Sequence, residues 1–134
     1  MHFDIPSDFT EGRKVQKAIL DAVARFGFDP DNVFAIKLAL EEAMINAIRH
    51  GNKLDRDKKV HVDAIINEHE ARITIEDEGI GFNRATVPDP TSEENLTKCS
   101  GRGLLLMETY MTSVEYSNKG RCVHMVKRRE PVKV

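Results

Sequence analysis

The sequence predicts an α+β domain, a two-layer α/β sandwich in which helices pack on one face of a mixed, mainly antiparallel sheet. Two segments in the first half of the chain place apolar residues at helical spacing, and later segments alternate apolar and polar residues as strands do. Their order is strand, two helices, two strands, loop, helix and two strands. The 134 residues fit a single domain, 1–134, which can bury roughly two-thirds of its unfolded surface.

The elements begin with a short edge strand at residues 3–5, closed by Pro6. A helix follows over residues 10–26, where Gly27 stops it and the apolar positions recur at helical spacing: Val15, Ile19, Ala22, Val23 and Phe26. The second helix has Asp29 as its N-cap and Pro30 at its first position, and extends to about residue 50. Gly51 is placed for a left-handed C-terminal cap.

The later segments give two strand pairs. Residues 60–66 and 71–77 form strands joined by the polar turn 67–70, and residues 113–118 and 121–127 form a hairpin around 118–120. Periodicity is lost over residues 83–100, which contain Pro88 and Pro90. A loop of this length inside a compact domain is typical of a lid or of disorder. A third helix is expected over about residues 103–110.

Composition narrows the function classes. The formal net charge is −2, and duplex binding needs a basic stripe, so nucleic acid is disfavoured as a direct partner. Two cysteines, Cys99 and Cys122, are too few for a disulfide framework and lack zinc spacing. The chain shows no signal peptide and no apolar stretch of the ~20 residues that span a bilayer. We therefore expect a cytoplasmic protein with free thiols and no membrane partner.

The most informative motif is residues 77–82, Asp-Glu-Gly-Ile-Gly-Phe, which follows a strand. Ile73, Ile75 and Asp77 share one strand face, so Asp77 points toward the core, where a carboxylate needs a partner. Gly79 and Gly81 expose backbone against which a flat ring can lie. The combination suits an adenine pocket in which Asp77 accepts from the amino group. An aspartate that merely caps a glycine-rich turn is the equally plain alternative.

A polar pair lies on the second helix. Glu42 and Asn46 are four residues apart, so they stack on one face, bordered by Ala35 and Ala39, which leave room above the helix. The core stripe is a separate face made of Val33, Ile36, Leu40, Ala43 and Ala47. An asparagine oxygen suits Mg²⁺, and a glutamate can take a proton from an attacking hydroxyl. The alternative is an ordinary solvated face.

A second glycine pair precedes the predicted third helix. Gly101, Arg102 and Gly103 lie where free backbone N–H groups bind anions, and Arg102 could add its charge to a phosphate. A packing turn explains the same residues without any ligand.

The order of these motifs resembles that of the GHKL ATP-binding superfamily. It consists of a helix that carries an asparagine, a D-x-G-x-G turn, a long loop and a G-x-G-L sequence at the start of a helix. Residues 42–52 resemble the N box of its small anti-sigma-factor serine kinases, residues 77–82 their first glycine box and residues 101–107 their second. Residues 111–116 resemble their closing strand and residues 88–96 their lid. The likeness extends from about residue 5 to 127. Arg102 departs from the pattern, because other members have smaller or apolar residues there.

The resemblance implies a GHKL ATPase fold, with ATP and Mg²⁺ as cofactors and a nucleotide lid at about residues 83–100. Asn46 would coordinate Mg²⁺, and Glu42 would be the general base. Asp77 would accept from adenine beside Gly79 and Gly81, and the second box would hold the phosphates through Gly101, Arg102 and Gly103.

The implied function is an ATP-dependent protein-serine kinase and anti-sigma factor. It would phosphorylate a serine of an anti-anti-sigma protein of the STAS type, bind a sigma factor, and form a homodimer. The alternative is an ATP-gated protein-binding module without kinase activity. A histidine-kinase catalytic domain is disfavoured, since only about 30 residues precede the second helix, too few for the helical hairpin that carries the phosphoacceptor.

Overall fold

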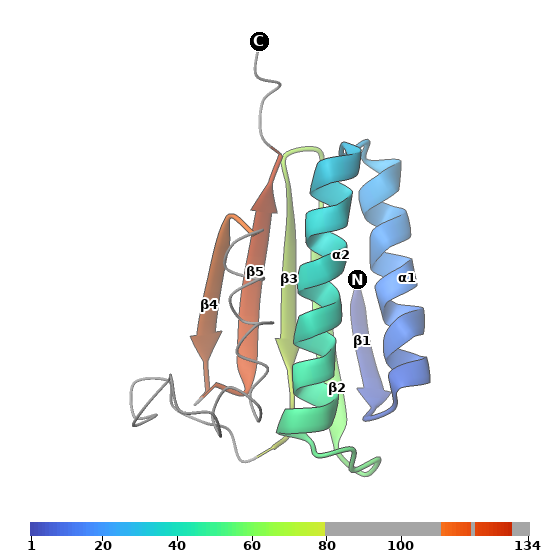
Figure 1. Cartoon of the computed structure of the whole chain (residues 1–134), viewed down its shortest axis with the longest axis vertical. Helices are drawn as coiled ribbons and strands as arrows, with labels where there is room; N and C mark the ends of the chain where they lie inside the picture. The colour runs from blue at the N-terminus through green and yellow to red at the C-terminus, as the bar shows by residue number, and fades with distance from the viewer. Residues whose placement is uncertain (80–110, 119, 130–134) are drawn as a thin grey trace.

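The computed structural model describes residues 1–79, 111–118 and 120–129. Two helices pack side by side on one face of a five-stranded sheet (Figure 1). The predicted third helix, 103–110, and the predicted lid, 83–100, lie outside the described residues. In chain order the elements are β1 (His2–Pro6), α1 (Phe9–Arg25), α2 (Pro30–Ile45), the π-helix η1 (Asn46–Gly51), β2 (Lys59–Ile66), β3 (Glu70–Glu76), β4 (Ser113–Ser117) and β5 (Cys122–Arg128).

The sheet has the strand order β1-β2-β3-β5-β4, and every described pair of neighbours is antiparallel. The mainly antiparallel α+β class predicted from the sequence is confirmed; the parallel pairing that a mixed sheet would contain does not occur among the described strands. β3 lies at the centre, with Ile73 and Ile75 each 1 % exposed. The alternation along β3 therefore turns its apolar side chains toward the helices, as expected for a half-buried strand.

Helix α1 ends at Arg25, one residue before the predicted end. Its N-cap Asp8 accepts a hydrogen bond from the Thr10 N–H, and Gly27 has a φ of +76°, so the predicted stop at Gly27 is confirmed. The prediction that Phe26 lies on the apolar face of the helix is wrong, because its side chain is 44 % exposed. The reversal at Gly27 turns Phe28 into the core instead, at 6 % exposure.

Helix α2 starts at the predicted residue, but its C-terminal end differs from the predicted left-handed cap. The Asp29 side chain accepts from the Asn32 N–H at 2.7 Å, and Pro30 occupies the first turn. At the other end the chain passes into the π-helix η1, where the Asn52 N–H reaches the Ala47 carbonyl. Gly51 lacks the positive φ of a left-handed cap, so that prediction is wrong; the left-handed residues are Lys53 and Leu54, with φ of 52° and 61°.

The core lies between the two helices and the sheet. Along α2 and η1 the predicted stripe is buried except for Val33, which is half-buried. Ala35 and Ala39, predicted to leave room above the helix, are 4 % and 1 % exposed and belong to the packed surface. The largest fully buried side chains come from both layers: Ile19, Ile36, Leu40, Met44, Ile48, Ile73, Ile75 and Met125. Within the described parts of the chain, no helix has the length and apolarity needed to cross a membrane.

Candidate functional site

Two of the predicted site residues, Glu42 and Asn46, lie where α2 passes into η1. Asn46 is the first residue of η1, and its backbone N–H bonds to the carbonyls of Ala43 and Glu42. Its side-chain Oδ1 is buried and accepts no hydrogen bond from the residues that the structure describes. Buried polar atoms are normally paired, so an unpaired one needs an explanation such as an absent ligand. π-helical turns are also frequent at functional sites.

Glu42 lies one helical turn before Asn46 and is half-buried. The pair therefore projects from consecutive turns of one continuous helix, as predicted from the four-residue spacing. Glu41, the neighbouring carboxylate, instead lines a groove on the α1 side of the helix. Two adjacent glutamates thus face different surroundings, and only Glu42 shares its face with the unpaired asparagine oxygen.

Asp77 follows directly after β3 and is half-buried. Burial raises the pKa of its carboxyl group above the ordinary 3.8, against the opposing effect of the Gly79 N–H, which donates to Oδ1 at 2.8 Å. The alternative prediction, that Asp77 caps the glycine-rich turn, therefore holds for its Oδ1 atom. Oδ2 accepts no hydrogen bond from the described residues, so it can still accept one from a ligand.

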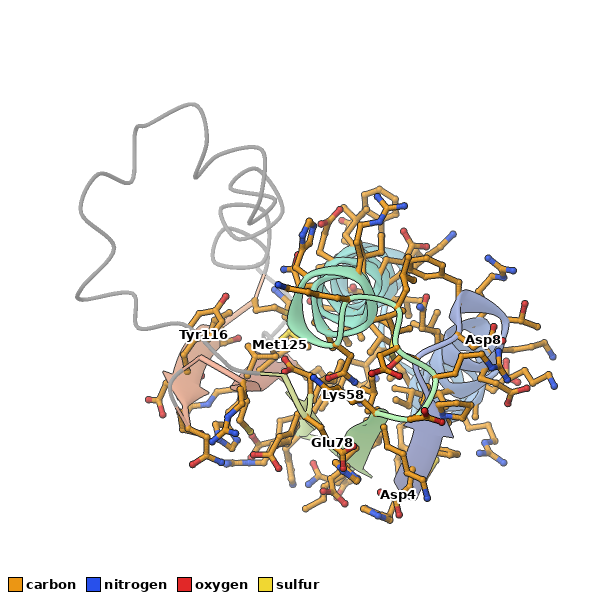
Figure 2. The ribbon with its side chains drawn as sticks, turned by 90° about the horizontal axis from the view of Figure 1, so that it is seen from below. Asp4, Asp8, Lys58, Glu78, Tyr116 and Met125 are labelled. Atoms are coloured by element: carbon orange, nitrogen blue, oxygen red, sulfur yellow. The ribbon has the colours of Figure 1, made fainter. Side chains whose placement is uncertain are left out.

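The end of η1 and the turn after β3 are pressed against each other. A Cβ on Gly51 would overlap Cγ and Oδ2 of Asp77, and a Cβ on Gly79 would overlap the Gly51 carbonyl. Glycine is therefore required at both positions by space. The role of Gly51 was missed by the sequence analysis, which assigned that residue a cap. Figure 2, viewed from this end of the molecule, shows Glu78 on the side of the turn toward Asp4.

Four predicted site residues cannot be placed. Gly81, Gly101, Arg102 and Gly103 lie outside the described residues, so their roles remain predictions. The structure brings Gly51, the last residue of η1, against the Asp77–Gly79 turn, which joins two of the three predicted motifs at one end of the sheet.

The side chains at this end suit a nucleotide better than a resident metal centre. Among the described residues, no group of three or more His, Cys, Asp or Glu side chains could hold a metal ion. Asn46 offers a single neutral oxygen, which fits Mg²⁺ bound mainly through phosphates and waters. The free oxygen of Asp77 beside side-chain-free backbone at Gly51 and Gly79 fits the amino edge of a flat base.

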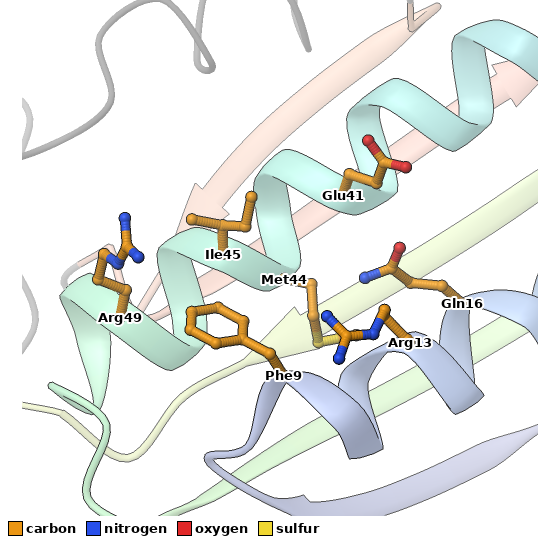
Figure 3. A pocket seen from close by; sticks show the side chains of 7 residues that line it. All are labelled: Phe9, Arg13, Gln16, Glu41, Met44, Ile45 and Arg49. Atoms are coloured by element: carbon orange, nitrogen blue, oxygen red, sulfur yellow. The ribbon is translucent and has the colours of Figure 1, made fainter.

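A separate groove of about 340 Å³ lies between α1 and α2 (Figure 3). The Arg49 guanidinium lies 5.6 Å from the centroid of the Phe9 ring, which closes one end of it. None of the four predicted site residues that the structure describes, Glu42, Asn46, Asp77 and Gly79, lines this groove. Its walls are formed by Phe9, Arg13, Gln16, Glu41, Met44, Ile45 and Arg49.

The chain is similar to known proteins over most of its length. Residues 5–127 match the family model of the histidine kinase-like ATPase domain. An anti-sigma F factor of Clostridium perfringens is 41 % identical over 99 residues, covering 71 % of this chain and 70 % of that protein. One from Oceanobacillus iheyensis is 37 % identical over 117 residues, covering 80 % of each.

A solved structure of the RsbU and RsbW domains of a Mycobacterium tuberculosis protein matches 98 % of this chain with a TM-score of 0.62. The match spans 33 % of that longer chain at 15 % sequence identity, so it supports the fold assignment alone. The family model and the two relatives each cover most of the sequence, including Glu42, Asn46 and Asp77 within residues 5–127. The chain therefore belongs to the histidine kinase-like ATPase domain family, the GHKL superfamily, and within it to the anti-sigma-factor kinases.

Proposed function

We propose that this protein is an ATP-dependent protein-serine kinase and anti-sigma factor. It transfers the γ-phosphoryl group of ATP to a serine of an anti-anti-sigma protein of the STAS type and binds a sigma factor in the alternative complex. The observation that carries the proposal is the buried, unpaired Oδ1 of Asn46 on the same π-helix whose last residue, Gly51, packs against Asp77.

The proposed roles follow from what each side chain can do. Asp77 accepts a hydrogen bond from the adenine amino group through the oxygen that the Gly79 N–H leaves free. Asn46 would hold Mg²⁺, which neutralises phosphate charge when bound. Gly81, Gly101, Arg102 and Gly103 complete the proposed pocket around the base and the phosphates.

Glu42 acts as the general base. The serine oxygen forms a bond to the γ-phosphorus while the bond from that phosphorus to the β,γ-bridging oxygen breaks. The hydroxyl proton passes to the Glu42 carboxylate, and ADP leaves with the electron pair of the broken bond. Such a transfer depends on positioning and charge neutralisation more than on covalent chemistry by the protein, which suits a small site.

The proposed partners rest on the relatives. Two of them are named anti-sigma F factors, and the coverage of about 70 to 80 % includes most of the described fold. A chain of this family that holds either a sigma factor or its antagonist would couple phosphorylation to transcription. We propose that it works as a homodimer.

The first test follows phosphate to serine. Purified protein is mixed with Mg²⁺, ATP labelled at the γ-phosphate, and anti-anti-sigma domains from the same genome. We expect labelled phosphoserine on one of them. Glu42→Gln should lower transfer about 100-fold or more while ATP affinity is kept, since only the base is lost. Glu41→Gln is the matched control, because that carboxylate faces the other side of α2, and it should transfer normally.

The second test isolates the metal. Asn46→Ala should weaken ATP binding about tenfold or more in the presence of Mg²⁺ and have little effect when EDTA removes the ion. Calorimetry with and without Mg²⁺ measures both. Tight ATP binding without any phosphoserine would instead favour the ATP-gated binding module, and no ATP binding at all would refute the proposal.

A further inference from the structure

Asn52, the residue after η1, has a fully paired and deeply buried side chain. It is 1 % exposed. Its Nδ2 donates to the Ser7 Oγ and to the Lys59 carbonyl, each at 2.9 Å, and its Oδ1 accepts from the Glu78 N–H at 2.7 Å. Both amide hydrogens and the carbonyl oxygen are thus used. One side chain joins the segment before α1, the start of β2 and the turn after β3.

The bond to Glu78 falls in the middle of the candidate site. Glu78 stands between Asp77 and Gly79, and these two residues contact Gly51, the residue immediately before Asn52. The two chain segments therefore touch on both sides of a single hydrogen bond. A close contact of this kind stays in register only while something prevents the segments from sliding, and the Asn52 amide is placed to do so.

The Glu78 side chain is fixed as well, on the opposite side of the turn. Its Oε1 accepts from the Lys59 N–H at 2.6 Å, and its Oε2 lies 3.0 Å from the His61 Nε2. The backbone of Glu78 is thus held by Asn52, and its carboxylate by β2. Ser7 supports Asn52 in turn, since its hydroxyl donates to the Lys58 carbonyl at 2.6 Å.

We propose that Asn52 is a positioning residue for base recognition: it fixes the turn that carries Asp77 against the end of η1. This role rests on the proposed function of Asp77 as the acceptor of the adenine amino group. Asn52 does not touch the base itself. It sets the place of an oxygen that must lie within about 0.5 Å of its productive position to discriminate between bases.

Selectivity is the sensitive readout. A site built to hydrogen-bond one ligand group loses discrimination when its acceptor moves, whereas general loss of stability affects both nucleotides alike. We expect Asn52→Ala to lower ATP affinity about tenfold and to lower the ratio of ATP to GTP affinity by a similar factor. Calorimetry of the folded variant with each nucleotide measures both numbers.

Ser7→Ala is the milder second variant, should Asn52→Ala fold poorly. It removes one partner of the Asn52 amide and keeps the bond to Glu78, so the ratio should fall in the same direction by about twofold to fivefold. Asn67→Ala is the matched control. The Asn67 side chain accepts from two backbone N–H groups, of His69 and Glu70, in the hairpin at the far end of β3. It should lose stability and keep the wild-type ratio.

The outcomes separate the two proposals. Wild-type protein that binds ATP in preference to GTP, with a ratio that falls in Asn52→Ala and Ser7→Ala, supports the positioning role. An unchanged ratio in both variants, with lowered stability, shows that Asn52 is structural only and overturns the role while leaving the proposed function intact. Wild-type protein without ATP affinity overturns the proposed function and the positioning role together.

Discussion

At the scale of single residues, the candidate site depends on two positions where no side chain fits. Gly51 ends η1 with its backbone against the Asp77 carboxylate, and Gly79 lies against the Gly51 carbonyl. Asp77 is half-buried, which raises the pKa of its carboxyl group. The contact places an acceptor oxygen beside bare backbone, and any added methyl group must displace one of the two segments.

Gly51→Ala should damage both stability and binding. The new methyl group overlaps Asp77, so we expect a loss of about 1–3 kcal/mol in the free energy of unfolding. ATP affinity should fall about tenfold or more, because Asp77 is pushed from its place. Denaturant unfolding and calorimetry measure the two effects.

Gly27→Ala separates stability from binding. Gly27 has a φ of +76° and lies at the far end of α1. An alanine there is strained by roughly 1 kcal/mol and leaves the site untouched. Equal losses of ATP affinity in both glycine variants would contradict a specific role for Gly51.

The sequence predicted part of this residue-level picture. Strand alternation was enough to direct Asp77 inward, and the spacing of Glu42 and Asn46 was enough to place them on one helix face. The contact between Gly51 and Asp77 joins residues 26 positions apart and depends on how the helix packs on the sheet, which no local pattern encodes. Asn52 likewise reads as an ordinary turn residue until its three partners are seen.

At the scale of elements, α2 carries the site and is strongly defined at its start. The Asp29 carboxylate accepts from the Asn32 N–H, and Pro30 fixes the first turn. At its end, the change to π-helical hydrogen bonding continues the chain for six more residues, Asn46–Gly51. The capping contacts therefore fix where the helix that carries Glu42 begins.

Asp29→Ala should destabilise the protein by about 1 kcal/mol, because the Asn32 N–H loses its acceptor. The comparison is Asp31→Ala, an exposed first-turn carboxylate whose loss should cost roughly 0.5 kcal/mol through the helix dipole alone. Urea unfolding followed by circular dichroism gives both values. A larger effect at Asp31 than at Asp29 would contradict the capping assignment.

The presence of each described helix and strand was predicted better than the residues at which it begins and ends. All five strands and both described helices occur where the apolar patterns placed them, within one or two residues of the predicted bounds for most ends. The end of the second helix was wrong because glycine at a helix terminus usually indicates a left-handed cap, whereas here close packing demands it. The prediction for Phe26 was wrong because the turn at Gly27 leaves its ring exposed and directs that of Phe28 inward.

At the scale of the whole molecule, both described helices lie on one face of the sheet (Figure 1). Most side chains on the other face of the described strands are polar. On that face His61 lies 2.5 Å from the Asp4 carboxylate of β1 and 3.0 Å from Glu78. These two carboxylates raise the pKa of His61 above its ordinary 6.5, with Asp4 the larger cause. The first strand is thereby connected to the turn that holds Asp77.

Stability should therefore depend on pH through His61. A raised folded-state pKa gives stabilisation that is fully present below pH 6.5, the ordinary value, and is lost as pH rises through the folded value. The wild type should exceed His61→Gln in unfolding free energy by more at about pH 6 than at about pH 8.5. Glu78→Gln should remove a smaller part of the same dependence. A constant difference across this range would contradict the assignment.

The fold class could be predicted because the order of helical and strand patterns allows few two-layer arrangements. The strand order, with β5 between β3 and β4, follows from long-range pairing such as Ile75 with Val123. Single-strand patterns carry no information on which strands become neighbours, so the sequence alone left that order open.

The connection that follows η1 contains two adjacent non-glycine residues with positive φ. Lys53 and Leu54 are both left-handed, a conformation that costs a non-glycine residue roughly 1–2 kcal/mol. The Leu54 N–H nonetheless reaches the Ile48 carbonyl at 2.8 Å. This short segment is kept in an unfavourable backbone conformation beside the buried, fully hydrogen-bonded side chain of Asn52. Glycine at either position would relieve this backbone cost while leaving the hydrogen bonds of Asn52 in place.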